Sequence, residues 1–264
     1  MAIWPIQKHF FKLKLAITLS ELITFSSHLR KSIQLFDGTL VPTNAIVFAL
    51  SASGTSKDKS LQTVRKSLSL AYEQMEEQRR GFAKTKAERA AALHGNGKHE
   101  WSKFYESPKP LQAGLGTVEG LMHHFAEISQ NPIGAGSITS SEIGSELQAN
   151  GSMIDIIKTI AVAYDLGNVP PKIVKSAENQ TQAISNFPVN ALFFGSQEAI
   201  LFNNDIKGKF KMAFNTQLAR RSIFAFTPEQ PVQREISSID ELYKIREAER
   251  ERVLHAQQEL NEFT

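Results

Sequence analysis

The most constraining feature of this sequence is an apolar run at residues 45–50 that leads directly into a small polar loop and then a helix. The run AIVFAL has strand length and contains β-branched side chains, which is typical of a strand covered on both faces of a parallel sheet. The loop at residues 51–58 contains Gly54 and Lys57, and apolar side chains recur at helical spacing over residues 60–80. A strand, a small-residue loop with a lysine and a helix, in this order, form the context that a phosphate-binding loop requires.

Further strands and helices predict an α/β fold. Two more segments, at residues 186–195 and 222–226, have strand character. Helices are predicted at residues 10–36 with a turn at Asp37 and Gly38, at residues 117–128, at residues 153–164 and, with amphipathic character, at residues 238–263. Buried strands separated by helices favour a largely parallel sheet flanked by helices.

Composition limits the partners and the compartment. The 30 Lys and Arg residues against 27 Asp and Glu give a net charge of +3, which permits contact with nucleic acid without requiring it. Zero cysteines exclude disulfides, thiolate metal sites and cysteine nucleophiles. Lys8, Lys12 and Lys14 interrupt the apolar N-terminus, and no stretch reaches the roughly 18 apolar residues of a membrane-spanning helix. We therefore expect a cytoplasmic protein with no membrane partner.

The loop matches the phosphate-binding pattern GxxxxGK(S/T) in part, in either of two registers. In the first register Lys57 is the phosphate lysine and Gly54 lies three residues before it. Ser51 and Ser56 then replace the two defining glycines, and Asp58 replaces the hydroxyl residue that normally binds Mg²⁺. A carboxylate is a suitable Mg²⁺ ligand, but its charge also repels a triphosphate.

In the second register Lys59 and Ser60 restore the lysine–hydroxyl pair, while Ser53 and Asp58 occupy the glycine positions. We favour Lys57, because in its register the glycine lies where the backbone must turn and the loop begins directly after the strand. Both registers predict a nucleotide site. Its candidate residues are Gly54, Thr55, Ser56, Lys57, Asp58, Lys59 and Ser60.

Four stretches carry a family resemblance: residues 51–57, 116–121, 137–144, and 190–197 followed by 218–224. Read in this order, they resemble a family of phage and prophage proteins that is found alone or joined to primase domains and is related to replicative helicases. The resemblance covers about two-thirds of the chain, and it is carried by the order of the stretches, since each of them is a loose motif.

The resemblance implies a fold, ligands and partners. We expect a P-loop NTPase-like domain at residues 41–235, between an N-terminal helical segment at residues 1–40 and a C-terminal amphipathic helix at residues 236–264. ATP and Mg²⁺ would be the cofactors. Single-stranded DNA and replication proteins such as a primase would be partners, and the chain would form a homo-oligomer in the cytoplasm of a bacterial host.

The resemblance also implies roles for individual residues. Glu142 would be the acid that orients Mg²⁺ or the attacking water, with Asp58 or Ser60 as a further metal ligand. Gln197 would contact the γ-phosphate. The alternatives are that Glu142 begins a helix, where the dipole favours an acid, and that Ser196 or Gln197 is a residue at a helix start.

Arg220 or Arg221 would resemble an arginine finger, which stabilises transition-state charge and is often supplied across a subunit boundary. The alternative is that both arginines form surface salt bridges. The adjacent His123 and His124 would point to different sides of a helix, so they do not predict a metal site.

A basic and aromatic segment is the local candidate for nucleic-acid binding. Lys207, Lys209 and Lys211 would meet phosphates, and Phe210 would stack on a base. The alternative is a solvated turn before Phe214.

These features predict an ATP-dependent, DNA helicase-like or translocase-like replication protein of phage or mobile-element type. The main alternative is a catalytically degenerate P-loop protein that serves as a DNA-binding or assembly scaffold. A third possibility is a structural protein whose C-terminal helix mediates association.

Overall fold

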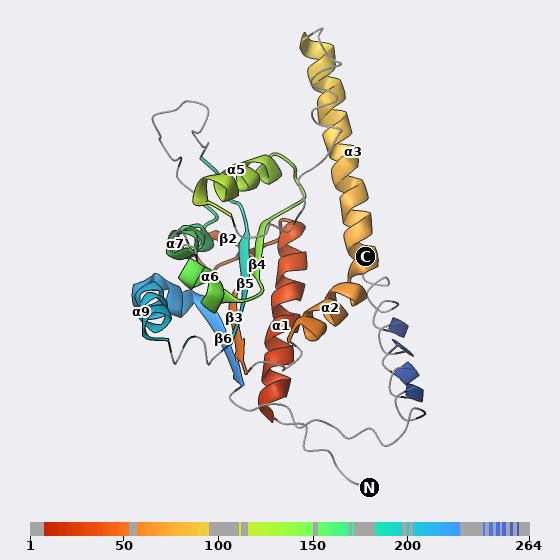
Figure 1. Ribbon diagram of the computed structural model, residues 1–264. Helices are drawn as coiled ribbons and strands as arrows, with labels where there is room; N and C mark the ends of the chain where they lie inside the picture. Colours follow the sequence, from red (N-terminus) through yellow and green to blue (C-terminus); the bar gives the residue numbers. More distant parts are fainter. Residues whose placement is uncertain are drawn as a thin grey trace.

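A four-stranded sheet with helices on both faces lies at the centre of the computed structural model (Figure 1). The structure describes residues 8–52, 57–94, 111, 116–149, 153–168, 171, 183–196, 200 and 203–227, and also residues 240, 243–244, 247–248, 250–251, 254–255 and 258. The strands, which adopt the order β4-β5-β3-β6, are β3 (Ile46–Ser51), β4 (Gly136–Ser140), β5 (Val189–Ser196) and β6 (Ser222–Thr227). All neighbouring strands are parallel. The predicted α/β class, with a parallel sheet flanked by helices, is therefore confirmed.

β3 occupies the interior of the sheet because its side chains are apolar on both faces. Phe48 points into one apolar layer, and Val47 and Ala49 point into the other. The Phe48 ring stacks on Phe193 of β5 and on Phe224 of β6, with centroid distances of 4.8 and 5.3 Å. A strand with this pattern is stable only where helices cover both faces of the sheet.

Different helices cover the two faces. The face to which Phe48 points is covered by α5 (Val118–Ser129), α6 (Ile143–Ala149), α7 (Met153–Tyr164) and α9 (Asn204–Ala213) (Figure 1). The other face is covered by α1 (Lys8–His28) and α2 (Lys57–Ser67). Leu13 and Ile17 of α1 pack there on Val47 and Ala49, so α1 is a layer of the α/β core. α3 (Ser69–His94) continues from α2 and extends beyond the sheet.

The first helix is shorter than predicted. α1 ends at His28, and the chain then forms an antiparallel hairpin of β1 (Ser32–Gln34) and β2 (Leu40–Pro42). The predicted turn at Asp37 and Gly38 is present, but it joins these two strands. Asp37 Oδ1 accepts from the Thr39 N–H at 2.9 Å, and Gly38 has a φ of +85°.

Arg30 explains why α1 stops early. Its backbone has a φ of +54°, which a continuing helix does not allow. Its guanidinium lies 4.5 Å from the centroid of the Phe187 ring, and its Nη2 donates to the Asn131 carbonyl oxygen at 3.3 Å. These contacts come from segments that are distant in sequence, so helical periodicity alone did not predict the helix end.

The other helix predictions have mixed outcomes. α5 begins after Thr117, whose hydroxyl accepts from the Gly120 N–H at 3.1 Å, and α7 has the predicted bounds. The single helix predicted over residues 60–80 is two helices, α2 and α3, with Leu68 buried between them. At the C-terminus the described positions are helical, and the rest of that predicted helix lies outside the described residues. None of the helices in the described part of the chain has the length and apolar character needed to cross a membrane.

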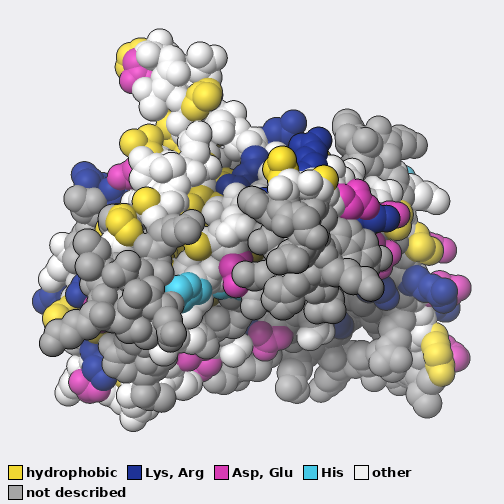
Figure 2. Space-filling view, turned by 90° about the horizontal axis from the view of Figure 1, so that it is seen from above, with side chains coloured by type: hydrophobic (Ala, Val, Ile, Leu, Met, Phe, Trp, Pro, Cys, Tyr) yellow, Lys and Arg dark blue, Asp and Glu magenta, His cyan; other side chains and the backbone are white. Residues whose placement is uncertain are grey.

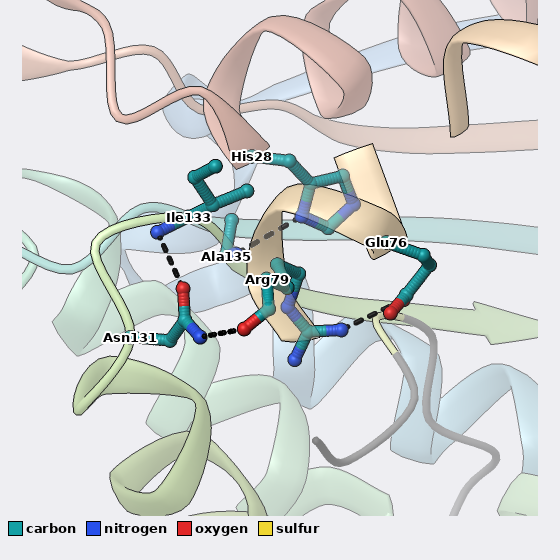
Figure 3. A network of polar contacts seen from close by, with 6 residues as sticks. All are labelled: His28, Glu76, Arg79, Asn131, Ile133 and Ala135. Carbon is teal, nitrogen blue, oxygen red and sulfur yellow. Dashed lines mark hydrogen bonds and ion pairs between the residues drawn. The ribbon is translucent and has the colours of Figure 1, made fainter. Parts of the chain in front are cut away.

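A buried polar network joins α1 and α3 to the loop before β4 (Figure 3). At the end of α1, His28 Nδ1 accepts from the Ala135 N–H at 3.0 Å. Arg79 of α3 has a side chain only 1% exposed, and it donates to Glu76 at 2.7 Å. Asn131 Nδ2 donates to the Arg79 carbonyl oxygen at 3.1 Å, which ties the loop to α3.

This network keeps one histidine uncharged. Burial, followed by the positive charges of Arg79 and Arg30, lowers the pKa of His28 from 6.5 to about 3. The imidazole is therefore neutral at ordinary pH. Because Nδ1 acts as an acceptor, the imidazole proton is assigned to Nε2.

Candidate nucleotide-binding site

The chain reverses its direction across the sheet between β3 and β5. From β3 it passes first through α2, on the face covered by α1, and reaches β4 at one edge. From β5 it passes through α9, on the opposite face, and reaches β6 at the other edge. Adjacent parallel strands whose connections leave in opposite directions form a topological switch point, and open α/β sheets bind ligands outside the carboxyl ends of such strands.

A lysine and a glutamate meet at this switch point. Lys57 is the first residue of α2, which follows β3, and Glu142 lies between β4 and α6. Lys57 Nζ is 3.9 Å from Glu142 Oε2, with exposed fractions of 12% and 33% for the two side chains. The structure thus brings together two residues that the sequence analysis selected separately, 85 positions apart.

Glu142 also contacts β5, the strand that lies between β4 and β3 in the sheet. Its Oε1 accepts from the backbone N–H of Ser196, the last residue of β5, at 3.0 Å. Glu142 does directly precede α6, as the helix-start alternative expected. Its carboxylate nevertheless reaches across to β5 and α2, and the position of the acid is fixed by elements on both sides of it.

All four strands of the sheet end in a hydroxyl residue, and three of these residues lie in register. Ser51 of β3 lies in register with Ser196 of β5 and with Thr227 of β6, and all three are buried. The sequence analysis placed Ser51 in the loop and did not select Ser196 or Thr227 as site residues, because each predicted strand stopped one residue before its hydroxyl, at residues 50, 195 and 226. The signal was present in the sequence: a single Ser or Thr directly follows each apolar run.

A second carboxylate near Glu142 was also missed. Glu146 of α6 accepts a hydrogen bond from the hydroxyl of Ser140, the last residue of β4. Burial is the main influence that raises the pKa of Glu146; the Ser140 bond opposes the rise and the charge of Glu142 adds to it. Its spacing of four residues from Glu142, just after a strand, was the available sequence signal.

The structure separates the two registers of the loop. Lys57 reaches Glu142, whereas Asp58 and Lys59 are exposed and Ser60 is half-buried on the first turn of α2. The geometry therefore favours the register based on Lys57. The remaining loop candidates Gly54, Thr55 and Ser56, and also Gln197, lie outside the described residues.

The two candidate finger arginines lie at the amino ends of the strands, opposite Lys57 and Glu142. Arg220 and Arg221 belong to the short helix η3 (Ala219–Arg221), directly before the first residue of β6. Arg221 forms an ion pair with Asp165, with Nε donating to Oδ1 at 2.7 Å. This hydrogen bond from Arg221 lowers the pKa of Asp165. Neither arginine is brought to Lys57 and Glu142 of the same chain.

The candidate stacking residue Phe210 has another role. Residues 207–211 belong to helix α9, so the alternative of a solvated turn is wrong. The Phe210 ring lies 4.3 Å from Phe214 and 5.9 Å from Phe48, as centroid distances. The ring packs on the core that covers β3, which contradicts the prediction that Phe210 stacks on a base.

The lysines of α9 differ from one another. Lys209 Nζ donates to the Leu147 carbonyl oxygen at 3.1 Å and pairs with Asp205 at 3.1 Å. Lys207 and Lys211 are exposed. Figure 2 looks onto the end of the molecule where the strands begin, and the Lys and Arg side chains described there lie among Asp and Glu, apart from one denser basic group.

The acidic groups are few for a permanently bound metal. Among the described residues, no group of three or more His, Cys, Asp or Glu side chains is arranged to hold a metal ion. A nucleotide-bound Mg²⁺ needs fewer protein ligands, because it is usually held by one or two carboxylates together with phosphates and water.

No family model, curated protein or solved structure matches this chain. Its function is therefore inferred from the site itself.

Proposed function

We propose that this chain binds ATP at the carboxyl edge of its sheet and acts as a P-loop, helicase-like ATPase in DNA replication of phage or mobile-element type. The observation that carries the proposal is the pairing of Lys57 with Glu142 at the switch point between β3 and β5. A lysine at the start of the helix that follows a buried strand is the position from which P-loop proteins neutralise phosphates. An acid that follows a neighbouring strand completes the arrangement.

Each residue would have a defined task. Lys57 and the N–H groups in the first turn of α2 would bind the outer phosphates, since an ammonium group and a helix N-terminus both favour negative charge. Glu142, fixed by the Ser196 N–H, would orient the attacking water. Mg²⁺, when bound with the nucleotide, neutralises phosphate charge. Its oxygen ligands would come from Glu142 and from Asp58 or Ser60, a donor set that suits a hard cation.

The action on DNA rests on the family resemblance and on two structural features that are compatible with it. Lys207 and Lys211 are exposed on one helix and can meet phosphates of single-stranded DNA. Arg220 and Arg221 lie at the edge opposite the nucleotide site, so as fingers they would act on the nucleotide of a neighbouring subunit. A homo-oligomer is therefore part of the proposal.

The proposal is tested by ATP binding and hydrolysis with and without single-stranded DNA, in the parent protein and in two matched variants. Lys57→Ala should abolish nucleotide binding, whereas Lys59→Ala, which removes an exposed lysine two residues away, should bind ATP like the parent. An equal loss in both variants would contradict the Lys57 register. A parent protein that binds no ATP would refute the nucleotide function.

One observation favours a second function, a catalytically degenerate P-loop scaffold for DNA or replication proteins. The residue after Lys57 is Asp58, whose charge opposes a triphosphate where a hydroxyl is usual. The same measurements separate the two functions. A scaffold would bind single-stranded DNA or a partner with no turnover of ATP, and Lys57→Ala would leave that binding unchanged.

A further inference from the structure

Arg65 connects three elements around the candidate site. It lies on α2, about two turns beyond Lys57. Its Nε and Nη2 donate to the two carboxylate oxygens of Glu21 on α1, at 3.1 and 3.0 Å. The Glu21 side chain is only 2% exposed, so the two-pronged contact with Arg65 balances a buried charge.

The same guanidinium also reaches β4. Arg65 Nη2 donates to Thr139 Oγ1 at 3.0 Å. Thr139 lies three residues before Glu142, whereas Arg65 belongs to the helix that begins with Lys57. One side chain therefore bridges the element that carries the lysine and the element that carries the acid.

Polar contacts matter for the placement of α2 because its apolar anchoring is slight. Leu61 is the buried residue of this helix, and most of its other side chains are polar or charged. The Lys57–Glu142 distance of 3.9 Å stands at the outer limit of an ion pair. A shift of α2 by about 1 Å relative to β4 would separate the pair, and misplacement on that scale is enough to impair a catalytic site.

We propose that Arg65 is a positioning residue that sets the spacing between Lys57 and Glu142 through its bond to Thr139. This inference rests on the proposed nucleotide function and extends it. ATP without metal would be bound by Lys57 and the start of α2, which move together as one helix. Binding of ATP with Mg²⁺ also requires Glu142, and it depends on how α2 is placed against β4.

Thr139 permits a clean test because it can be changed without breaking the Arg65–Glu21 pair. Thr139→Val keeps the shape of the side chain but removes the acceptor, and Thr139→Ser restores the acceptor. Thr159→Val is the matched control, since it removes a hydroxyl that donates to the Asp155 carbonyl oxygen within α7. Thermal unfolding of all variants gives the stability change that a purely structural role would produce.

The experiment measures ATP affinity of the full chain by equilibrium dialysis, with Mg²⁺ and with EDTA. Thr139→Val should weaken binding in Mg²⁺ by about tenfold and change binding in EDTA by less than about twofold, while Thr139→Ser and Thr159→Val resemble the parent. Parent-like binding by Thr139→Val, or an equal loss with and without Mg²⁺, overturns the positioning role alone. Absence of ATP binding by the parent overturns the nucleotide function and this inference together.

Discussion

Acidification should destabilise this protein through His28, because its imidazole is buried and neutral. Its pKa is about 3 in the folded chain, against 6.5 for an ordinary histidine. A base whose pKa is lowered by folding contributes stability that is fully present above pH 6.5 and is lost as the pH falls from 6.5 toward 3. The imidazole ring packs edge-on against Tyr72, with a centroid distance of 6.0 Å. Its Nε2 has no hydrogen-bond partner among the described residues, so no carboxylate there would balance the charge of an added proton.

The two pKa values set the size of the effect. Each pKa unit corresponds to about 1.4 kcal/mol, which gives a ceiling of about 5 kcal/mol for the whole interval. Between about pH 7.5 and about pH 5, the His28 contribution to the free energy of unfolding should fall by about 2 kcal/mol. The unfolded chain binds a proton over this range, and the folded chain does not.

The assay is urea denaturation across that pH range in the parent, in His28→Asn and in His123→Asn. Asn at position 28 retains an acceptor for the Ala135 N–H but has no proton to gain. Its baseline stability should be lower, and its loss of stability on acidification should be smaller than that of the parent by about 2 kcal/mol. His123→Asn, a matched change at another helical histidine, should follow the parent. Parallel pH curves for the parent and His28→Asn would refute the buried neutral imidazole.

Two further predictions concern the fold that supports the site. Gly167→Ala should destabilise the protein by about 2 to 4 kcal/mol, because Gly167 has a φ of +66° and an added Cβ would lie 2.3 Å from the Phe187 backbone nitrogen. In contrast, Gly208→Ala in the open interior of α9 should stabilise the protein by up to about 1 kcal/mol. Thermal unfolding of the two variants measures the sign of each change. Asn190→Ala should lower the free energy of unfolding in urea by about 2 kcal/mol, since the buried amide bonds both Ser27 and the backbone of Ala45.

The strands were predictable because burial on two faces leaves a direct trace in the sequence. The apolar runs around Phe48, Phe193 and Phe224 predicted three strands to within a few residues. The same reasoning ended each predicted strand one residue too early, before Ser51, Ser196 or Thr227, because a polar side chain was taken to mark the end of the buried segment. At the carboxyl ends of these strands the hydroxyl side chains are themselves buried, so each strand continues one residue further.

Contacts between distant segments were not predictable from local patterns. Arg65 and Glu21 are 44 residues apart and have ordinary charged identities, so nothing in the sequence marks them as a buried pair. The early end of α1 depends on the contact of Arg30 with Phe187, and the role of Phe210 depends on the rings around Phe48. Lys57 was selected because it follows a predicted strand, whereas Glu142 was selected from the family resemblance. The structure places both after strands, where parallel sheets gather functional residues.

The location of Arg220 and Arg221 links two parts of the proposed function that are otherwise independent. Strand direction places them at the amino edge of the sheet, whereas Lys57 and Glu142 lie at the carboxyl edge. No side chain can span a strand of six residues, which is about 20 Å long. Within one chain the nucleotide would therefore lack these arginines, and their participation in hydrolysis requires a second subunit whose amino edge faces the site. An arginine finger in the proposed function would consequently require a homo-oligomer.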